Sequence, residues 1–444
     1  MSNFNIDDQT FRDLNIFTGT TGSNTIFNLF KGTRTVGGRE RLREMMQSPS
    51  SDLQEITLRK DSIKYFYDHH INLDIKNEEL DLVEYYLKFD KSKFRGNIID
   101  SVVEYIARNS SNDYYIIKTG LKYLIKLTKY ISIFIKKNSL CEAPEYLTLL
   151  FKQIEQIIEA GSLKHALLID ENKLKFLQVI KLDRAFRNKE RDSINTLLTL
   201  IYEFDVFENV SLVASLKGFS FAKYTEDENL KVCLTGLFHP NLLDPVKNDV
   251  HFDKNNNIVF LTGSNMSGKS SLLKSIGLVI YLSHLGFPVP AHYMETNIFN
   301  GLITTINLPD DINQGLSHYY TEVKRVKEVS QALLERNKMF VIFDELFRGT
   351  NVKDAFDASF LIISELSRIT NSAFFISTHI IELADKLKKF NNISFRYLQT
   401  TFEKDRPIFT YQLTDGVSKE YLGMFIVLNE GIVEIIRKAY DRFQ

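Results

Sequence analysis

The stretch LTGSNMSGKSS, residues 261–271, is the strongest indication of fold and function in the second half of this 444-residue chain. It fits the pattern G-x-x-x-x-G-K-[ST], with Gly263, Gly268, Lys269 and Ser270 in the fixed places. The apolar run NIVFL precedes it, and the helical run SSLLKSIGLVIYLSHL follows it. Strand, glycine-rich loop and helix in this order predict a phosphate-binding loop, because loop N–H groups and a helix N-terminus together attract anionic oxygens.

Composition narrows the class of protein. The chain is 44% hydrophobic and 25% charged, which is typical of a soluble globular protein with two or three domains. The net charge of the whole chain is −1, which does not favour nucleic-acid binding, although this value is compatible with a local basic face. Neither Cys141 nor Cys233 has metal-ligand spacing. The polar start MSNFNIDDQT lacks the apolar core of a signal peptide. No apolar run approaches the ~18–20 residues that span a bilayer. These features predict a cytoplasmic protein that does not contact a membrane.

The first half of the chain has the pattern of long helices. Only Pro49 and Pro144 occur before residue 239, and proline interrupts helices. Two runs, APEYLTLLFKQIEQIIEAG and RAFRNKERDSINTLLTLIYEFDVFENVSLVASL, are amphipathic. The run DYYIIKTGLKYLIKLTKYISIFIKK predicts a third helix, whose inward residues are Tyr115, Ile117, Leu121, Leu124, Leu127 and Ile131.

The pattern changes near residue 220, where short apolar runs begin to alternate with helices. The runs KVCLTGL, NIVFLTG, MFVIFDE and AFFISTH indicate a parallel sheet that is buried on both faces. The sequence therefore predicts a helical domain over residues 1–230, followed by an α/β domain with a mostly parallel sheet over residues 231–444. The phosphate-binding loop makes the second domain a candidate nucleotide-binding domain.

Acidic and histidine residues follow two of the predicted strands. In a phosphate-binding fold, Lys269 would reach the β- and γ-phosphates, and Ser270 would bind Mg²⁺. Asp344, at the end of MFVIFDE, would complete the Mg²⁺ site, and Glu345 would orient or deprotonate the attacking water. His379, just after AFFIST, would reach a γ-phosphate or that water. The simpler alternatives are a solvated strand end and a loop histidine without a role.

The run LSHYYTEVKRVKEVSQALLERNK predicts a helix that leads into the Asp344 strand. Ser317 lies at its start, where it is either an N-cap or a group that faces a γ-phosphate held by a second subunit. The order of phosphate loop, helix, Asp-Glu strand and histidine is that of the ABC-type ATPases, which work as face-to-face dimers. The predicted inward residues of this helix are Tyr319, Val323, Val326, Ser330 and Leu333.

Five separated motifs resemble the ATPase domain of the MutS family of DNA mismatch-repair ATPases. They are TGSNMSGKSS, LSHLGFPVPA, LSHYYTEV, DELFRGTNVKDA and STHIIELAD, and FTYQLTDGVSKEYLGMFIVLNEGI resembles the end of that domain. The resemblance covers about residues 235–440. More faintly, TIFNLFKGTRTVGGRERLREMM resembles the start of the family's helical core or lever domain, in which Gly37 and Gly38 would allow close packing.

This resemblance implies ATP and Mg²⁺ as ligands and a dimer formed through the ATPase domains. Tyr411 falls where the family stacks adenine, whereas Pro245 stands where the family often has an aromatic residue. Ser264 replaces a usual proline, and Ser267 replaces a usual glycine. The implied ATP-binding residues are Gly263, Ser264, Asn265, Met266, Ser267, Gly268, Lys269, Ser270, Ser271 and Tyr411.

The resulting prediction is a MutS-like DNA-binding ATPase that hydrolyses ATP in a dimer to move helical levers on DNA. The chain begins within the lever core, so we expect no mismatch-recognition or connector domain and no mismatch reading of the usual kind. KYLIKLTKYISIFIKK and RAFRNKERD are the candidate DNA-contacting runs. The main alternative is an ATP-switched clamp that acts on an RNA or protein partner without binding DNA.

Overall fold

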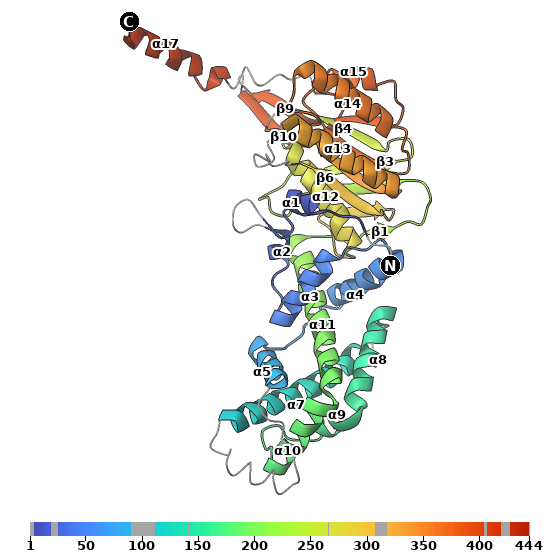
Figure 1. Ribbon diagram of the computed structural model, residues 1–444, viewed down its shortest axis with the longest axis vertical. Helices are drawn as coiled ribbons and strands as arrows, with labels where there is room; N and C mark the ends of the chain where they lie inside the picture. Colours follow the sequence, from blue (N-terminus) through green and yellow to red (C-terminus); the bar gives the residue numbers. More distant parts are fainter. Residues whose placement is uncertain are drawn as a thin grey trace. The chain divides into compact units, whose positions relative to one another are not determined.

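A computed structural model of the chain divides into two compact units (Figure 1). The helical unit comprises Phe30–Gln47 and Thr57–Val213, and the α/β unit comprises Met1–Leu29, Ser48–Ile56 and Ala214–Gln444. The predicted fold class, a helical part joined to an α/β part with a mostly parallel sheet, is confirmed. The residues that the structure describes are 4–18, 25–89, 112–139, 142–264, 266–306, 318–403, 406–418 and 427–443.

The division differs from the expected boundary between residues 230 and 231. The N-terminal segment groups with the α/β unit because its polar groups bind the edge strand β6 (Gly301–Thr305). Asn5 forms a parallel bridge to Gly301. The buried Asp13 carboxylate accepts hydrogen bonds from the Thr304 hydroxyl, at 2.7 Å, and from the Ile306 N–H, at 2.9 Å.

The helical unit is built around α7 (Asn112–Asn138). The predicted inward residues of this helix from Ile117 to Ile131 are buried, but Tyr115 is 72% exposed. The predicted helix from residue 184 onward is interrupted, because a π-helical turn, η1, separates α10 from α11. The remaining elements are α3 (Val36–Gln47), α4 (Leu53–Asp68), α5 (Asn77–Lys88), α8 (Glu145–Glu159), α9 (Gly161–Ala166), α10 (Phe176–Arg184), η1 (Ala185–Lys189) and α11 (Arg191–Lys217), of which α4 and α11 each extend into both units.

Two glycines allow α3 to approach α11 closely, as the sequence predicted. A Cβ atom at Gly37 would lie 2.4 Å from ring carbons of Tyr202, and one at Gly38 would lie 2.2 Å from Asp205 Oδ2. That buried carboxylate accepts hydrogen bonds from the backbone N–H of Arg34 and from both donors of Thr35. A larger residue at either position would therefore disrupt a well-packed helix contact.

The central sheet of the α/β unit has six strands in the order β10-β9-β4-β8-β7-β6. All neighbouring pairs are parallel except β10 and β9. The strands β4, β7 and β8 are apolar and fully buried up to their carboxyl ends, because helices cover both faces. Their bounds are β4 (Ile258–Thr262), β7 (Met339–Asp344), β8 (Ala373–Ser377), β9 (Ile393–Glu403) and β10 (Arg406–Asp415).

The run KVCLTGL does not belong to this parallel sheet, which corrects the sequence prediction. It forms β2 (Lys231–Leu237) of a separate four-stranded sheet, with β1 (Lys223–Tyr224), β3 (Asn248–Asp253) and β5 (Tyr293–Thr296). There β2 pairs antiparallel with both β3 and β5. Buried and less buried residues alternate at the start of β2, as expected for a strand with one solvated face.

Helices α13 (His318–Glu335), α14 (Val352–Leu366) and α15 (Leu383–Leu387) pack on one face of the central sheet (Figure 1). Helix α12 (Lys269–His284) packs against β6 and β7. None of the described helices combines the length and the apolar character that a membrane span requires. The other helices of this unit are α1 (Asp8–Asp13), α2 (Ile26–Leu29) and α17 (Ile432–Phe443).

The inward face of α13 differs from the prediction. Val326 is buried, but Val323 and Ser330 are exposed. Two charged residues, Glu322 and Arg325, occupy the buried face at 7% and 6% exposure. Periodicity of apolar residues cannot reveal such positions, because their burial depends on tertiary partners. The buried residues of α13 are Glu322, Arg325, Val326, Val329 and Ala332.

We expect His284, at the end of α12, to make the stability of the protein depend on pH. The ring is 1% exposed; Nδ1 lies 2.8 Å from the Ser50 carbonyl oxygen, and Nε2 accepts the Phe299 N–H at 3.3 Å. Burial lowers the pKa of His284 to about 4, below the unfolded value of about 6.5. The unfolded state therefore binds more protons between these values, so stability is retained above about pH 6.5 and lost as pH falls towards 4, by up to ~1.4 kcal/mol per unit.

The measurement is urea unfolding between pH 7 and pH 4.5, for the wild-type chain and for His284→Gln. The glutamine amide supplies an N–H donor and a carbonyl acceptor but does not titrate. The unfolding free energy of His284→Gln should therefore fall less steeply with acid than that of the wild type. His251→Gln, at an exposed position on β3, is the control. Identical slopes for all three proteins would contradict the role of His284.

Candidate functional site

The loop between β4 and α12 has the backbone that its glycines predict. Gly268 is the N-cap of α12, with a φ of 98°, in the left-handed region that favours glycine. A Cβ atom there would lie 3.1 Å from the ring of Tyr411. The loop therefore lies directly before a helix N-terminus, which is an arrangement that favours phosphate oxygens.

Lys269 is buried and folds back over this loop. Its Nζ donates to the carbonyl oxygens of Gly263, at 2.9 Å, and Ser264, at 3.2 Å. Burial lowers the pKa of Lys269, and the carboxylates of Glu345 and Asp344 oppose that shift. The hydroxyls of Ser264 and Ser267 are buried without a hydrogen-bond partner among the described residues. Unpaired hydroxyls beside a buried ammonium are suited to bind an anion.

Two oxygens suited to Mg²⁺ meet at the edge of the sheet. Ser270 Oγ, in the first turn of α12, donates to Asp344 Oδ2 at 2.6 Å. Ser377, at the end of β8, donates to the other oxygen of Asp344 and fixes its orientation. Because Mg²⁺ prefers oxygen ligands, the pair of Ser270 and Asp344 fits the ion that the sequence predicted here.

Glu345 lies at the centre of a charged cluster. Its Oε1 lies 4.0 Å from Lys269 Nζ, and its Oε2 lies 3.7 Å from His379 Nδ1 and 3.7 Å from Arg348 Nη1. Its backbone is left-handed, with a φ of 59°, and its N–H donates to the Ser377 carbonyl oxygen at 3.1 Å. The structure thus brings together Lys269, Glu345 and His379, which sequence reasoning selected from three separate motifs.

A cavity of about 710 Å³ opens beside the loop. Its size lies in the usual range for small-molecule sites, roughly 300–1,000 Å³. Gly263 is not among its lining residues, although the backbone of Gly263 contacts Lys269. Asn265 and Ser317 lie outside the residues that the structure describes. The predicted site residues that line the cavity are Ser264, Met266, Ser267, Gly268, Lys269, Ser270, Ser271, Glu345 and Tyr411.

Tyr411 lies on a bulge of β10, where the pairing with β9 is irregular. The Asn248 side chain replaces the missing strand contacts: its amide nitrogen donates to the Tyr411 carbonyl oxygen at 3.0 Å, and its oxygen accepts the Leu413 N–H at 2.7 Å. The Tyr411 ring is half exposed and borders the same cavity. The sequence analysis did not select Asn248 and missed this contact.

Three further residues of the site were not predicted. They are Ser377, which orients Asp344; Arg348, which lies near the carboxylates of Glu345 and Glu322; and Glu322, which also accepts the Gly349 N–H. Arg348 follows Glu345 by three positions in DELFRG, a spacing that could have suggested an ion pair. Nothing in the sequence identifies Glu322 as buried.

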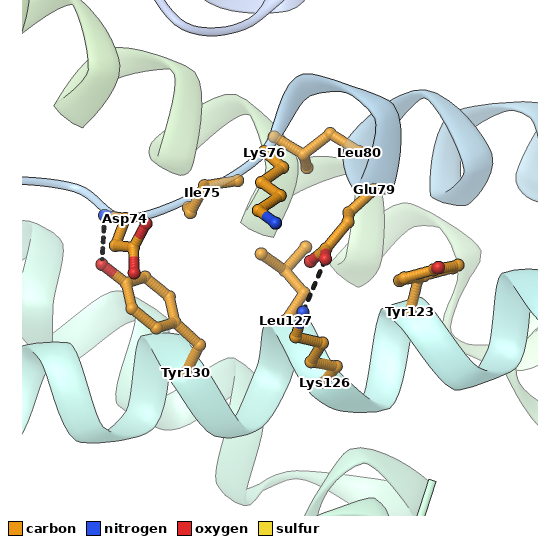
Figure 2. Close-up of a pocket in the computed structure, with 9 residues that line it drawn as sticks. All are labelled: Asp74, Ile75, Lys76, Glu79, Leu80, Tyr123, Lys126, Leu127 and Tyr130. Atoms are coloured by element: carbon orange, nitrogen blue, oxygen red, sulfur yellow. Dashed lines mark hydrogen bonds and ion pairs between the residues drawn. The ribbon is translucent and has the colours of Figure 1, made fainter. Parts of the chain in front are cut away.

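In the helical unit, ion pairs engage several cations that were candidates for DNA contact. Lys126 pairs with Glu79 at 2.5 Å, across a cavity of about 150 Å³ that Figure 2 shows, and Tyr130 accepts the Asp74 N–H there. Arg187, a second candidate cation, is fully buried and pairs with Asp183 at 2.6 Å. Lys129 likewise pairs with Glu171. The exposed candidate cations are Lys126, Lys136, Lys137, Arg184, Lys189 and Arg191.

Fold and site together define an α/β protein in which a glycine-rich loop precedes a helix N-terminus, with an added helical unit. Comparison with known families makes this specific: residues 259–444 match MutS domain V, and residues 9–336 match MutS domain III. The chain belongs to the MutS family.

Sequence identity to individual proteins of this family supports the assignment. The chain is 25% identical over 317 residues to a protein of Thermosipho melanesiensis named DNA mismatch repair protein MutS, covering 69% of this chain and 37% of that protein. A Clostridioides difficile protein of the same name is 28% identical over 333 residues, covering 72% of this chain and 33% of that protein. A Thermotoga maritima protein of that name is 30% identical over 197 residues, covering 44% and 24%. The chain thus spans about a third of the length of the relatives it matches.

Proposed function

We propose that this chain is a MutS-like DNA-binding ATPase that hydrolyses ATP with Mg²⁺, works as a dimer and moves its helical levers on DNA. The observation that carries the proposal is the position of Glu345. Its carboxylate lies 3.7–4.0 Å from Lys269, His379 and Arg348, and it directly follows Asp344, which bonds Ser270. A fixed carboxylate between a phosphate loop and a metal-binding pair suits the activation of water.

Each residue of the cluster has a distinct proposed role. Lys269 holds oxygens of the β- and γ-phosphates, and Ser270 and Asp344 hold Mg²⁺, which when bound offsets the phosphate charge. Glu345 orients a water molecule and takes its proton as the water oxygen attacks the γ-phosphorus and the bond to ADP breaks. His379, which shares a carboxylate oxygen with Arg348, contacts the γ-phosphate. Asn265 at the phosphates and Ser317 from a second copy are proposed from the family resemblance alone.

An exposed apolar face on α17 supports a dimer formed through the α/β units. Ile432, Ile435, Ile436 and Tyr440 are 43–64% exposed and recur at the three- and four-residue spacing of one helix face. Contiguous exposed apolar residues of this kind usually mark an interaction site. A second copy of the chain is the occupant that we propose.

DNA binding separates this proposal from its alternative. The experiment measures ATP hydrolysis and DNA affinity with duplex, mismatched, branched and single-stranded DNA at several salt concentrations. We expect at least one form of DNA to stimulate hydrolysis several-fold. The affinity of the chain for that DNA should fall steeply with salt concentration, since each neutralised phosphate adds about −0.9 to the slope of log K against log salt. Normal hydrolysis without DNA binding at any salt concentration would favour an ATP-switched clamp on an RNA or protein partner.

A further inference from the structure

We propose that Glu322 of α13 is a positioning residue for Glu345 and acts through Arg348 and the backbone of Gly349. The inference rests on the proposed ATPase function and adds residues that the phosphate-loop motifs do not include. Its starting point is a buried carboxylate: Glu322 is 7% exposed, on the helix face whose apolar residues Val326 and Val329 pack into the core. A buried charge of this kind needs specific partners.

The partners of Glu322 both lie in the segment that follows Glu345. Glu322 Oε2 accepts the Gly349 N–H at 3.3 Å, and Glu322 Oε1 lies 4.0 Å from Arg348 Nε. Arg348 Nη1 in turn lies 3.7 Å from Glu345 Oε2. One guanidinium therefore lies between two carboxylates, one on α13 and one in the candidate site.

The segment from Glu345 to Gly349 requires such support because its backbone is strained. Glu345 and Phe347 both have left-handed backbones, with φ of 59° and 62°. Side chains other than glycine adopt this conformation only where the surroundings enforce it. The segment also packs closely on α13: a Cβ atom at Gly349 would lie 2.5 Å from the Tyr319 nitrogen. The hydrogen bond from Gly349 to Glu322 fixes the end of this strained segment.

Helix α13 is itself anchored one turn further on. The buried Arg325 guanidinium donates to the Thr304 carbonyl oxygen at 2.7 Å, at the end of β6, and to Asp7 at 2.5 Å. Glu322 therefore projects from a helix that is fixed to the sheet. Through Arg348, this helix controls where the Glu345 carboxylate lies relative to Lys269 and His379, the other charged groups that face it.

The test is steady-state ATP hydrolysis by the full chain with Glu322→Gln, Arg348→Gln and the double variant. Glutamine at 322 keeps the acceptor for Gly349 but removes the charge that holds Arg348. We expect each single variant to lower kcat on the order of tenfold with the KM for ATP close to wild type, because misplacing a catalytic group slows chemistry more than binding. The double variant should be no slower than the slower single one. Arg348→Lys should recover part of the lost kcat.

Glu335→Gln, at an exposed position on the same helix, is the matched control and should behave as wild type. Unchanged kcat in both single variants, a raised KM with unchanged kcat, or multiplicative losses in the double variant would each overturn the inference. These outcomes all require a wild-type chain that hydrolyses ATP. A wild-type chain without hydrolysis would instead overturn the proposed function. If Glu322→Gln fails to fold, Arg348→Gln and Arg348→Lys still decide the question, since Arg348 is half exposed.

Discussion

Glu345→Gln should bind ATP with near wild-type affinity and hydrolyse it ~10²–10⁴-fold more slowly. The substitution keeps the size of the side chain but removes the base that takes the proton from water. The binding groups keep other contacts in this variant: Lys269 donates to the carbonyl oxygen of Gly263, and Ser270 donates to Asp344. The variant should therefore accumulate with ATP bound, which filter binding and phosphate release measure on the same sample.

The matched control for this prediction is Glu365→Gln on α14, an exposed carboxylate that pairs with Arg368. It should hydrolyse ATP at the wild-type rate. Turnover by Glu345→Gln at the wild-type rate would remove Glu345 from the proposed mechanism. Loss of ATP binding would instead assign the carboxylate to the binding of Mg²⁺ or nucleotide.

Lys269→Met should lose ATP affinity roughly 10- to 100-fold, since hydrogen bonds to charged groups contribute ~1.5–3 kcal/mol each. Methionine fills the buried volume of the lysine stem but offers no donor to the phosphates. Hydrolysis at limiting ATP should fall at least in proportion. Titration with a fluorescent ATP analogue measures the affinity directly.

An exposed lysine in the turn after β3, Lys254, provides the control for this variant. Lys254→Met should bind the analogue as the wild type does. Equal affinity of Lys269→Met and the wild type would show that the loop does not bind the phosphates. Both variants lose one positive charge. A difference in affinity between them therefore reports a local effect and not the change in net charge.

The parts of the site that the sequence could predict are those formed by local pattern. A buried strand, a glycine-rich loop and a helix follow one another in residues 258–284, so their geometry is set by neighbours in the chain. Asp344 and His379 were predictable for a related reason. Each comes at or just after the carboxyl end of a buried parallel strand, and open α/β sheets bind ligands at that edge.

The parts that could not be predicted depend on contacts between distant segments. Glu322 and Arg325 are charged residues on the core face of α13, and their partners are 27 residues after Glu322 and 318 residues before Arg325. The sequence predicted that the N-terminal segment belongs to the helical domain, yet Asp13 binds the edge strand of the α/β unit. In both cases the stabilising hydrogen bonds are between segments that sequence periodicity treats separately.

The most direct test of ATP hydrolysis at this site is phosphate release from ATP by the purified 444-residue chain with Mg²⁺, with Mg²⁺ removed by a chelator, and in Lys269→Met. We expect steady turnover by the wild-type chain that depends on Mg²⁺ and exceeds that of Lys269→Met at every ATP concentration. Equal phosphate release by the wild type and Lys269→Met at all ATP and Mg²⁺ concentrations would contradict the claim that this site hydrolyses ATP.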